Sequence, residues 1–217
     1  MFPEFFVYVC RMIQKNKTLI EKARELYYKY GIKSITMDDV ARELGISKKT
    51  LYRFVKNKTD LVEKVIDFEI EKRTGEFQKL DKSKLNAIEE LFEVNRHINH
   101  VLERHNPSMY YDLRKYYPDI FKRLHESKQN RMLKSLIKNL EKGKKEGLYR
   151  KEIDNEIIAR IQVARAENVT ESSCVSIRDY ISRKFFSELF IYHIRGIANS
   201  KGIKFLEDNI DQLKIKE

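Results

Sequence analysis

The chain has 217 residues, of which 41% are hydrophobic and 35% are charged, a composition typical of folded globular domains. No run of about 18 apolar residues occurs, so the sequence predicts no membrane-spanning helix. The formal net charge is +11, and it is uneven: residues 1–60 hold 13 Lys/Arg against 7 Asp/Glu, whereas the remaining residues hold 31 against 26. A polyanionic partner is therefore expected at the N-terminal part of the chain.

Few residues break helices, since the chain has 7 glycines and 3 prolines, and apolar residues recur at helical spacing; an all-α fold is predicted. Cys10 and Cys174 match no metal-binding or disulfide pattern, as expected for a protein of the reducing cytoplasm. The sequence contains no Gly-rich phosphate loop, nucleophile elbow or HExxH motif. We therefore expect no enzymatic activity, no cofactor and no metal site.

Residues 1–16 are interpreted as an N-terminal arm. The first eleven, MFPEFFVYVCR, are apolar and aromatic but lack the basic region and cleavage site of a signal peptide. Because Met12 begins a stretch that resembles a fresh start, a start codon assigned too early is the alternative. From Lys17 to Tyr30 apolar residues recur every three or four positions, which predicts a first helix that Gly31 ends.

Residues 36–58, TMDDVARELGISKKTLYRFVKNK, have the pattern of two short helices joined by a tight turn. Thr36 is a good N-cap, and Asp39 stands three residues on, where its carboxylate can reach back to the cap amide. Gly45 suits the left-handed residue that ends a helix. Ser47 is then expected to cap the second helix.

The second of these helices is expected to turn Leu51 into the core and its polar side chains outward. Those side chains are cations and hydroxyls, as required for a helix that enters a DNA major groove: Lys48, Lys49, Thr50, Tyr52 and Arg53. The alternative is an ordinary helical hairpin with a solvated basic face. A fourth helix is expected from Asn57 or Lys58 to about Leu80, with Lys58 and free backbone amides facing a DNA phosphate.

The segment ARELYYKYGIKSITMDDVARELGISKKTLYRFVKNKTDLV, within residues 17–66, resembles the DNA-binding domain of TetR-family transcriptional regulators, and LYRFVKNK is its most specific part. The resemblance implies a two-domain helical homodimer. Each N-terminal helix-turn-helix domain would read half of a palindromic operator in double-stranded DNA, and a C-terminal domain would bind a small effector and release the DNA. The DNA-contacting residues that it implies are Thr36, Ser47, Lys48, Lys49, Thr50, Tyr52, Arg53 and Lys58. Asp38 departs from the pattern, being acidic where some relatives place a base-reading cation.

Residues 67–217 are predicted to form a larger helical domain for effector binding and dimerisation. Helices are expected over about 83–104, 107–117, 118–146, 156–169 and 177–200, with a short one at 204–213. Histidines on one helix and aromatic rings in the next segment suggest an effector pocket between them. Its candidate residues are His97, His100, Val101, Tyr110, Tyr111, Tyr116, Tyr117 and Phe121. The alternative is that these rings pack in an ordinary core; the histidines lack a third metal ligand with convincing spacing.

The last strong helix, over about 177–200, is apolar on more than one face, which suggests a second chain against its outer side. The candidate dimer interface is Ile157, Ile161, Phe185, Phe186, Leu189, Phe190, His193 and Ile197. The alternative is a central core helix of the same chain. The leading hypothesis is thus a cytoplasmic, dimeric repressor released from its operator by a small molecule. An architectural or protein-partnered DNA-binding protein without an effector is the alternative.

Overall fold

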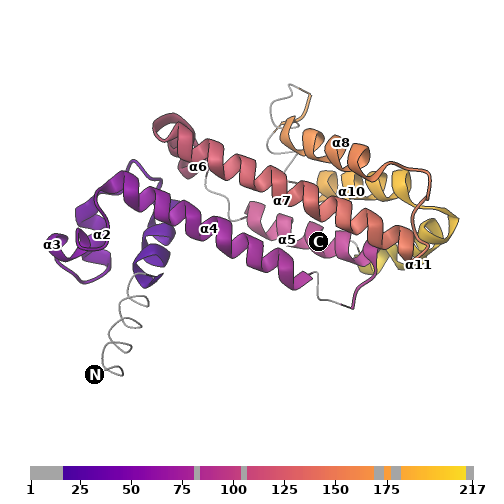
Figure 1. Cartoon of the computed structure of the whole chain (residues 1–217), viewed down its shortest axis with the longest axis horizontal. Helices are drawn as coiled ribbons and strands as arrows, with labels where there is room; N and C mark the ends of the chain where they lie inside the picture. The colour runs from indigo at the N-terminus through magenta and orange to yellow at the C-terminus, as the bar shows by residue number, and fades with distance from the viewer. Residues whose placement is uncertain (1–16, 81–83, 104–106, 169–173, 177–181, 214–217) are drawn as a thin grey trace. The chain divides into compact units, whose positions relative to one another are not determined.

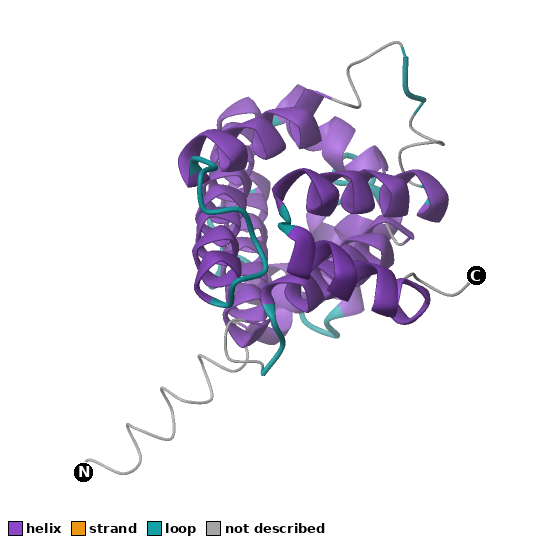
Figure 2. Ribbon diagram, turned by 90° about the vertical axis from the view of Figure 1, so that its right-hand side faces the viewer, coloured by secondary structure: helices purple, strands orange, loops and turns teal. Residues whose placement is uncertain are grey.

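The computed structural model describes most of the chain, in segments. The described residues are 17–80, 84–103, 107–168, 174–176 and 182–213. They are predominantly helical, and no strand is found among them (Figure 2), although an isolated bridge pairs Tyr149 with Ala198. The prediction of an all-α fold is thereby confirmed. The arm expected at residues 1–16 lies outside the described residues.

The helices follow one another as drawn in Figure 1, after a first helix at residues 17–30. They are α2 (Met37–Glu43), α3 (Lys48–Leu51), α4 (Lys58–Leu80), α5 (Ala87–Glu103), α6 (Pro107–Tyr116), α7 (Pro118–Lys145), α8 (Asn155–Asn168), α10 (Arg183–Ile197) and α11 (Ser200–Leu213). None of these helices combines the length and the apolar character needed to cross a membrane.

The chain divides into two compact units. The first contains the described residues up to 75 together with those of 105–127, and the second contains those of 76–104 and 128–217. The sequence predicted a first domain of residues 17–66, with α6 in the second domain. The first unit is larger because α6 completes its core: Met109 and Leu113 are buried in the same apolar cluster as Leu51.

A buried ion cluster joins the first helix to α4 inside the first unit. The Glu69 carboxylate on α4 is 3% exposed and accepts hydrogen bonds from Arg24 Nε at 2.5 Å and from Arg73 Nε at 2.6 Å. Arg73 also donates to the Tyr28 hydroxyl at 3.4 Å. These two arginines hold the pKa of Glu69 at about 2, against the opposing effect of burial, so the carboxylate stays charged in the fold.

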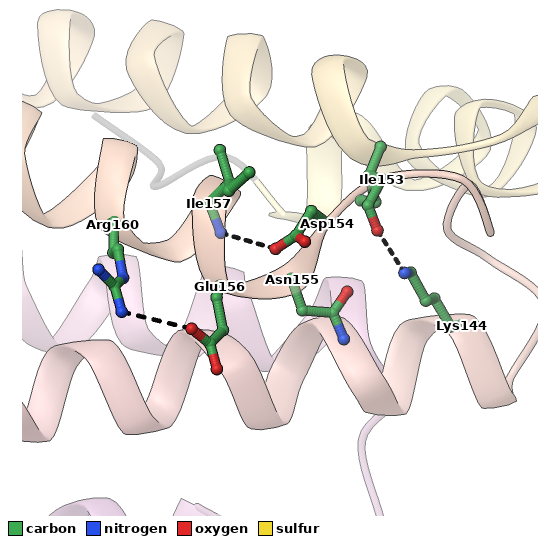
Figure 3. A pocket seen from close by; sticks show the side chains of 7 residues that line it. All are labelled: Lys144, Ile153, Asp154, Asn155, Glu156, Ile157 and Arg160. Atoms are coloured by element: carbon green, nitrogen blue, oxygen red, sulfur yellow. Dashed lines mark hydrogen bonds and ion pairs between the residues drawn. The ribbon is translucent and has the colours of Figure 1, made fainter.

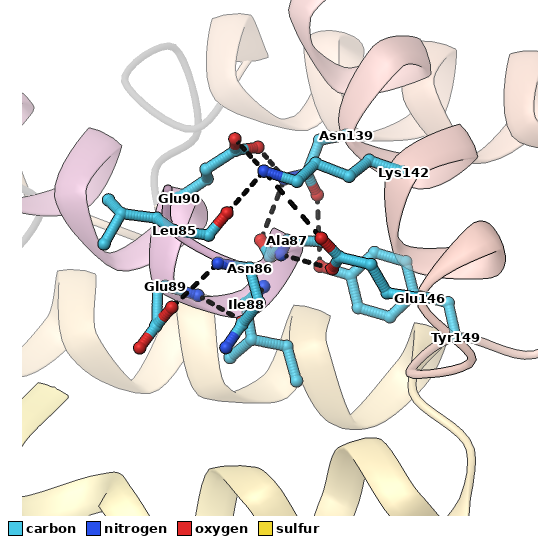
Figure 4. A network of polar contacts seen from close by, with 10 residues as sticks. All are labelled: Leu85, Asn86, Ala87, Ile88, Glu89, Glu90, Asn139, Lys142, Glu146 and Tyr149. Atoms are coloured by element: carbon cyan, nitrogen blue, oxygen red, sulfur yellow. Dashed lines mark hydrogen bonds and ion pairs between the residues drawn. The ribbon is translucent and has the colours of Figure 1, made fainter. Parts of the chain in front are cut away.

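In the second unit a polar network lies between α5 and the end of α7 (Figure 4). Asn139 Nδ2 donates to the Ala87 carbonyl at 2.8 Å, and the Tyr149 hydroxyl donates to Asn139 Oδ1 at 3.1 Å. The Glu146 carboxylate accepts the Ala87 N–H at 2.8 Å and so satisfies an amide at the start of α5. The Tyr149 ring lies directly on Gly143, where an added Cβ would come within 2.0 Å of it.

The C-terminal helices differ from the prediction in their boundaries. The expected helix over 177–200 ends at Ile197, and α11 begins at Ser200 rather than at residue 204. Between them Ala198 is extended, with ψ 148, and pairs with Tyr149. The Asn199 side chain donates to the carbonyls of Gly147 and Tyr149 at 3.0 and 3.3 Å. A long-range pairing, which helical periodicity does not report, therefore interrupts the helix.

Candidate nucleic-acid interface

The α2 helix begins with a complete capping box. The Thr36 hydroxyl oxygen accepts the Asp39 N–H at 3.1 Å, and the Asp39 carboxylate accepts the Thr36 N–H at 2.9 Å. The Thr36 hydroxyl, which donates to the Asp39 carboxylate at 2.6 Å, and the Thr36 N–H lower the pKa of Asp39. The predicted cap is confirmed, and the Asp39 carboxylate binds the Thr36 N–H at the start of α2.

The turn between α2 and α3 has the predicted geometry. Gly45 has φ 63, and Ile46 N–H donates back to the Ala41 carbonyl at 3.0 Å. Ser47 is extended, and its hydroxyl oxygen accepts the Thr50 N–H at 3.1 Å, which caps α3. A short turn that starts the second helix at a fixed angle is the defining feature of a helix-turn-helix.

The α3 helix turns its apolar side inward and its basic side outward. Leu51 is fully buried in the first unit's core, while Lys48, Lys49, Tyr52 and Arg53 are exposed. The Thr50 hydroxyl is half-buried and lies 2.9 Å from the Ser47 hydroxyl. Cationic and phenolic groups on an exposed helix face can contact both phosphates and base edges.

Asp38, for which no DNA contact was predicted, pairs with α3. Its carboxylate accepts from Lys48 Nζ at 2.8 Å, and this hydrogen bond raises the pKa of Lys48. Both side chains are exposed. Since an exposed ion pair is weak, a DNA phosphate can replace the carboxylate as partner.

Lys58, at the start of α4, is half-buried beside the loop that precedes α2. Its Nζ donates to the Lys33 carbonyl at 3.4 Å, and burial lowers its pKa although Asp112 and Asp39 act in the opposite sense. The amide of Asp60 is capped by the Asn57 side chain at 2.9 Å. The predicted phosphate contact of Lys58 thus lies next to the loop before α2.

Two further residues of this region, Asp112 and Tyr116, come from α6; no role was predicted for Asp112, and Tyr116 was predicted to line the effector pocket. The Asp112 carboxylate accepts the Lys33 N–H at 2.8 Å, and the Tyr116 hydroxyl lies 2.8 Å from Lys33 Nζ. Gly31, with φ 83, brings the loop so close that an added Cβ would lie 3.0 Å from Asp112 Oδ2. Because these contacts join residues about 80 positions apart, no local pattern could have revealed them.

The predicted effector-pocket residues lie in both units. Tyr110, Tyr117 and Phe121 pack against the first unit's core, whereas Tyr111 and Tyr116 are exposed. These placements match the alternative of ordinary packing for three of the rings. His97 lies on α5 in the second unit, and the side chains of His100 and Val101 fall outside the described residues. The pocket therefore stays a prediction.

An open hollow of about 620 Å³ lies elsewhere in the second unit, at the start of α8 (Figure 3). Its walls are mostly polar: Lys144 Nζ donates to the Ile153 carbonyl at 2.5 Å, and Arg160 pairs with Glu156 at 3.3 Å. Small-molecule pockets are usually lined by apolar groups, so the polar lining of this hollow does not fit the predicted effector pocket. Among the described residues no cluster of three or more potential metal ligands is found.

The candidate dimer residues divide into exposed and buried ones. Ile157 and Ile161, one helical turn apart on α8, are each 57% exposed, and Tyr192 on α10 is 76% exposed. The prediction that Ile197 lies at the dimer interface is corrected, because Ile197 is buried in its own unit's core and offers no surface to a second chain. His193 is half-buried; burial, together with the charge of Arg165, lowers its pKa to about 4.

The remaining candidates lie on α10. Phe185, Leu189 and Phe190 are half-buried, and Phe190 packs against the second unit's core. The side chain of Phe186 falls outside the described residues. An apolar surface on α8, with α10 half-buried beside it, is compatible with the predicted interface, which stays a prediction.

The capped α2, the tight turn and the basic face of α3 define a helix-turn-helix DNA-binding protein. Residues 19–65 match the family described as "Bacterial regulatory proteins, tetR family". This part of the chain is therefore similar to the DNA-binding domain of TetR-family transcriptional regulators.

Curated relatives carry the same type of name. The HTH-type transcriptional regulator SAB2452 of Staphylococcus aureus (strain bovine RF122 / ET3-1) is 28% identical over 128 residues, which are 51% of this chain and 69% of that protein. The HTH-type transcriptional regulator SAUSA300_2515 of Staphylococcus aureus (strain USA300) is 39% identical over 59 residues, which are 27% of this chain and 32% of that protein. The second match spans about a third of its relative.

Solved structures share the fold over most of their length. The TetR family protein CprB from S. coelicolor A3(2) is 15% identical with a TM-score of 0.61, over 94% of this chain and 100% of that one. NemR of E. coli, in its reduced form, is 12% identical with a TM-score of 0.67, over 86% and 98%. A gamma-butyrolactone receptor (ArpA like protein) is 17% identical with a TM-score of 0.62, over 94% and 98%. At these identities the likeness concerns the fold alone.

Proposed function

We propose that this protein is a dimeric repressor that binds a palindromic operator through α3 and leaves it when a small-molecule effector binds the second unit. The observation that best supports this proposal is the way α3 is held in the first unit. Leu51 anchors the helix in the core, and Lys48, Lys49 and Tyr52 are exposed beside the capped α2. A helix held in this way can enter the major groove as one body. The protein acts by binding and catalyses no reaction.

Dimerisation follows from the requirement for two half-sites and from the apolar side of α8. Ile157 and Ile161 expose a continuous aliphatic strip to solvent, which a second copy of the chain would bury. A two-fold dimer would carry two α3 helices, one for each half-site in successive major grooves.

An effector is supported by the solved relative that is named a gamma-butyrolactone receptor and by the helical second unit that this chain shares with it. The effector would act by preferring a dimer in which the α3 separation no longer matches the grooves. Its pocket would lie within the second unit and use the predicted residues of α5.

The test is selection of random duplex DNA by the purified full-length protein, repeated with Lys48→Ala and Tyr52→Phe. Enrichment of a palindrome, weakened by both changes, is expected, and the spacing of the half-sites measures the separation of the α3 helices. Salt-sensitive binding without an enriched sequence would refute the operator and favour an architectural DNA-binding protein. Addition of small-molecule extracts to the operator complex then tests the effector, whose existence predicts loss of binding.

A further inference from the structure

A patch of two lysines and two tyrosines lies on the first unit, where α6 meets the loop before α2. Its members, called here the lysine–tyrosine patch, are Lys33, Tyr111, Lys115 and Tyr116. Lys33 Nζ lies 2.8 Å from the Tyr116 hydroxyl, and Lys115 Nζ lies 3.1 Å from the Tyr111 hydroxyl. Both ammonium groups also stand over the Tyr116 ring, at 4.8 and 5.4 Å from its centroid. The two lysines thus share one aromatic platform.

The patch is exposed and uncompensated. Tyr111 and Tyr116 are 59% and 40% exposed, and both lysines are open to solvent. Within the described part of the chain, no carboxylate forms an ion pair with Lys33 or Lys115. Asp112, on the same helix as Tyr111, Lys115 and Tyr116, is buried, and its carboxylate accepts the Lys33 N–H.

The position of the patch is fixed relative to the candidate DNA interface. Asp112 ties α6 to the loop through the Lys33 N–H at 2.8 Å, and Lys58 Nζ donates to the carbonyl of the same Lys33 at 3.4 Å. Thr36 follows Lys33 by three residues. The patch therefore lies in the same compact unit as Lys58 and the helix-turn-helix, and the Lys33 backbone links it to Lys58.

The groups of the patch match the chemistry of a phosphodiester. Ammonium groups neutralise phosphate charge, and phenolic hydroxyls donate hydrogen bonds to phosphate oxygens. The hydrogen bond from Lys33 lowers the pKa of Tyr116, which makes its hydroxyl a stronger donor. The patch offers no fork of donors for reading a base edge, so it would contribute to affinity rather than to sequence selection.

We propose that the lysine–tyrosine patch binds the sugar–phosphate backbone of the DNA next to the half-site read by α3. The inference rests on the proposed function, since it assigns a second contact surface to the same DNA. It makes α6 part of the DNA-binding surface, beside the helix-turn-helix and the start of α4.

The test is the salt dependence of operator affinity for the full-length protein and its variant Lys115→Ala. Loss of one phosphate contact lowers the slope of log K against log salt by about 0.9 per protomer. The ratio of wild-type to variant operator affinity should therefore fall about threefold per contact when salt rises from about 50 to about 200 mM. Lys72→Ala is the matched control: it removes an exposed lysine of the same unit, roughly 21 Å along α4 from Lys58 at 1.5 Å per residue. The control slope should equal that of the wild type.

Ethylation of individual phosphates gives a second readout. Phosphates touched by the patch should weaken wild-type binding when ethylated and have no effect on Lys115→Ala. Equal slopes for Lys115→Ala and Lys72→Ala, with identical ethylation patterns, would overturn the inference; an acidic protein would then be the better occupant. Operator binding by Lys48→Ala is measured in parallel. If Lys48→Ala weakens binding and Lys115→Ala does not, the proposed operator recognition by α3 is retained and the role of the patch is rejected. Failure of the wild type to bind DNA would reject both.

Discussion

Replacing Glu69 by Gln should destabilise the first unit by about 3 kcal/mol at neutral pH. The Glu69 carboxyl has a pKa of about 2 in the fold against an ordinary value of 4.5, and each pKa unit corresponds to 1.36 kcal/mol, hence the estimate of about 3 kcal/mol. Gln keeps the size of the side chain but leaves Arg24 and Arg73 without their anion. Truncating one partner of a buried ion pair commonly costs about 3–5 kcal/mol, which agrees in magnitude.

The effect should depend on pH with a definite sign. Because the folded pKa is lower than the unfolded one, the stabilisation is complete well above pH 4.5 and is lost as pH falls from 4.5 toward about 2. At pH 3.5 about 1.4 kcal/mol of the wild-type advantage should already be gone, because the unfolded carboxyl is then mostly protonated.

The assay is urea unfolding read by hydrogen exchange on peptides from α4, so that the first unit is followed separately from the second. Glu71→Gln, which neutralises an exposed carboxylate two residues on, serves as control and should change stability little. A Glu69→Gln penalty below about 1 kcal/mol at pH 7, or one that stays constant down to pH 3.5, would refute this account of the cluster.

Other substitutions test other parts of the structure. Asp38→Asn should free Lys48 and remove a negative charge from the α3 side, so operator affinity at low salt should rise and the salt dependence steepen; unchanged binding would show that the pair is irrelevant to DNA. Ile161→Glu should convert the proposed dimer into a folded monomer in sedimentation experiments, because the Ile161 side chain is exposed within one chain; a dimer that persists would place the interface elsewhere. Gly143→Ala should lower the unfolding temperature, because the new Cβ overlaps the Tyr149 ring. Helix propensity alone predicts a stabilisation of about 1 kcal/mol, so a raised unfolding temperature would contradict the predicted overlap.

The helix-turn-helix could be predicted from sequence because its determinants are local. A cap and its partner stand three residues apart at Thr36 and Asp39, a left-handed turn needs Gly45, and Ser47 caps the next helix within its first turn. Each of these signals is complete inside a window of a few residues. The α4 boundaries, Lys58 to Leu80, were likewise predicted correctly.

The features that sequence reasoning missed depend on contacts between distant segments. The break at Ala198 exists because it pairs with Tyr149, 49 positions earlier, and nothing in the local apolar pattern marks it. The burial of Ile197 in its own core, rather than at an interface, could not be read from a helix that is apolar on several sides. The attachment of α6 to the first unit rests on Asp112 and the Lys33 amide, 79 positions apart.

That attachment has a consequence for how the protein is made. During synthesis, the first 75 residues leave the ribosome well before α6 does, so they exist for a time without Met109 and Leu113 to cover their apolar side. At about 5–20 residues per second, the roughly 50 residues up to 127 take about 3–10 s to appear. A fragment cut after residue 75 would remain in that incomplete state permanently. An isolated DNA-binding domain should therefore retain residues 105–127, by a linker if necessary, to behave as a stable protein.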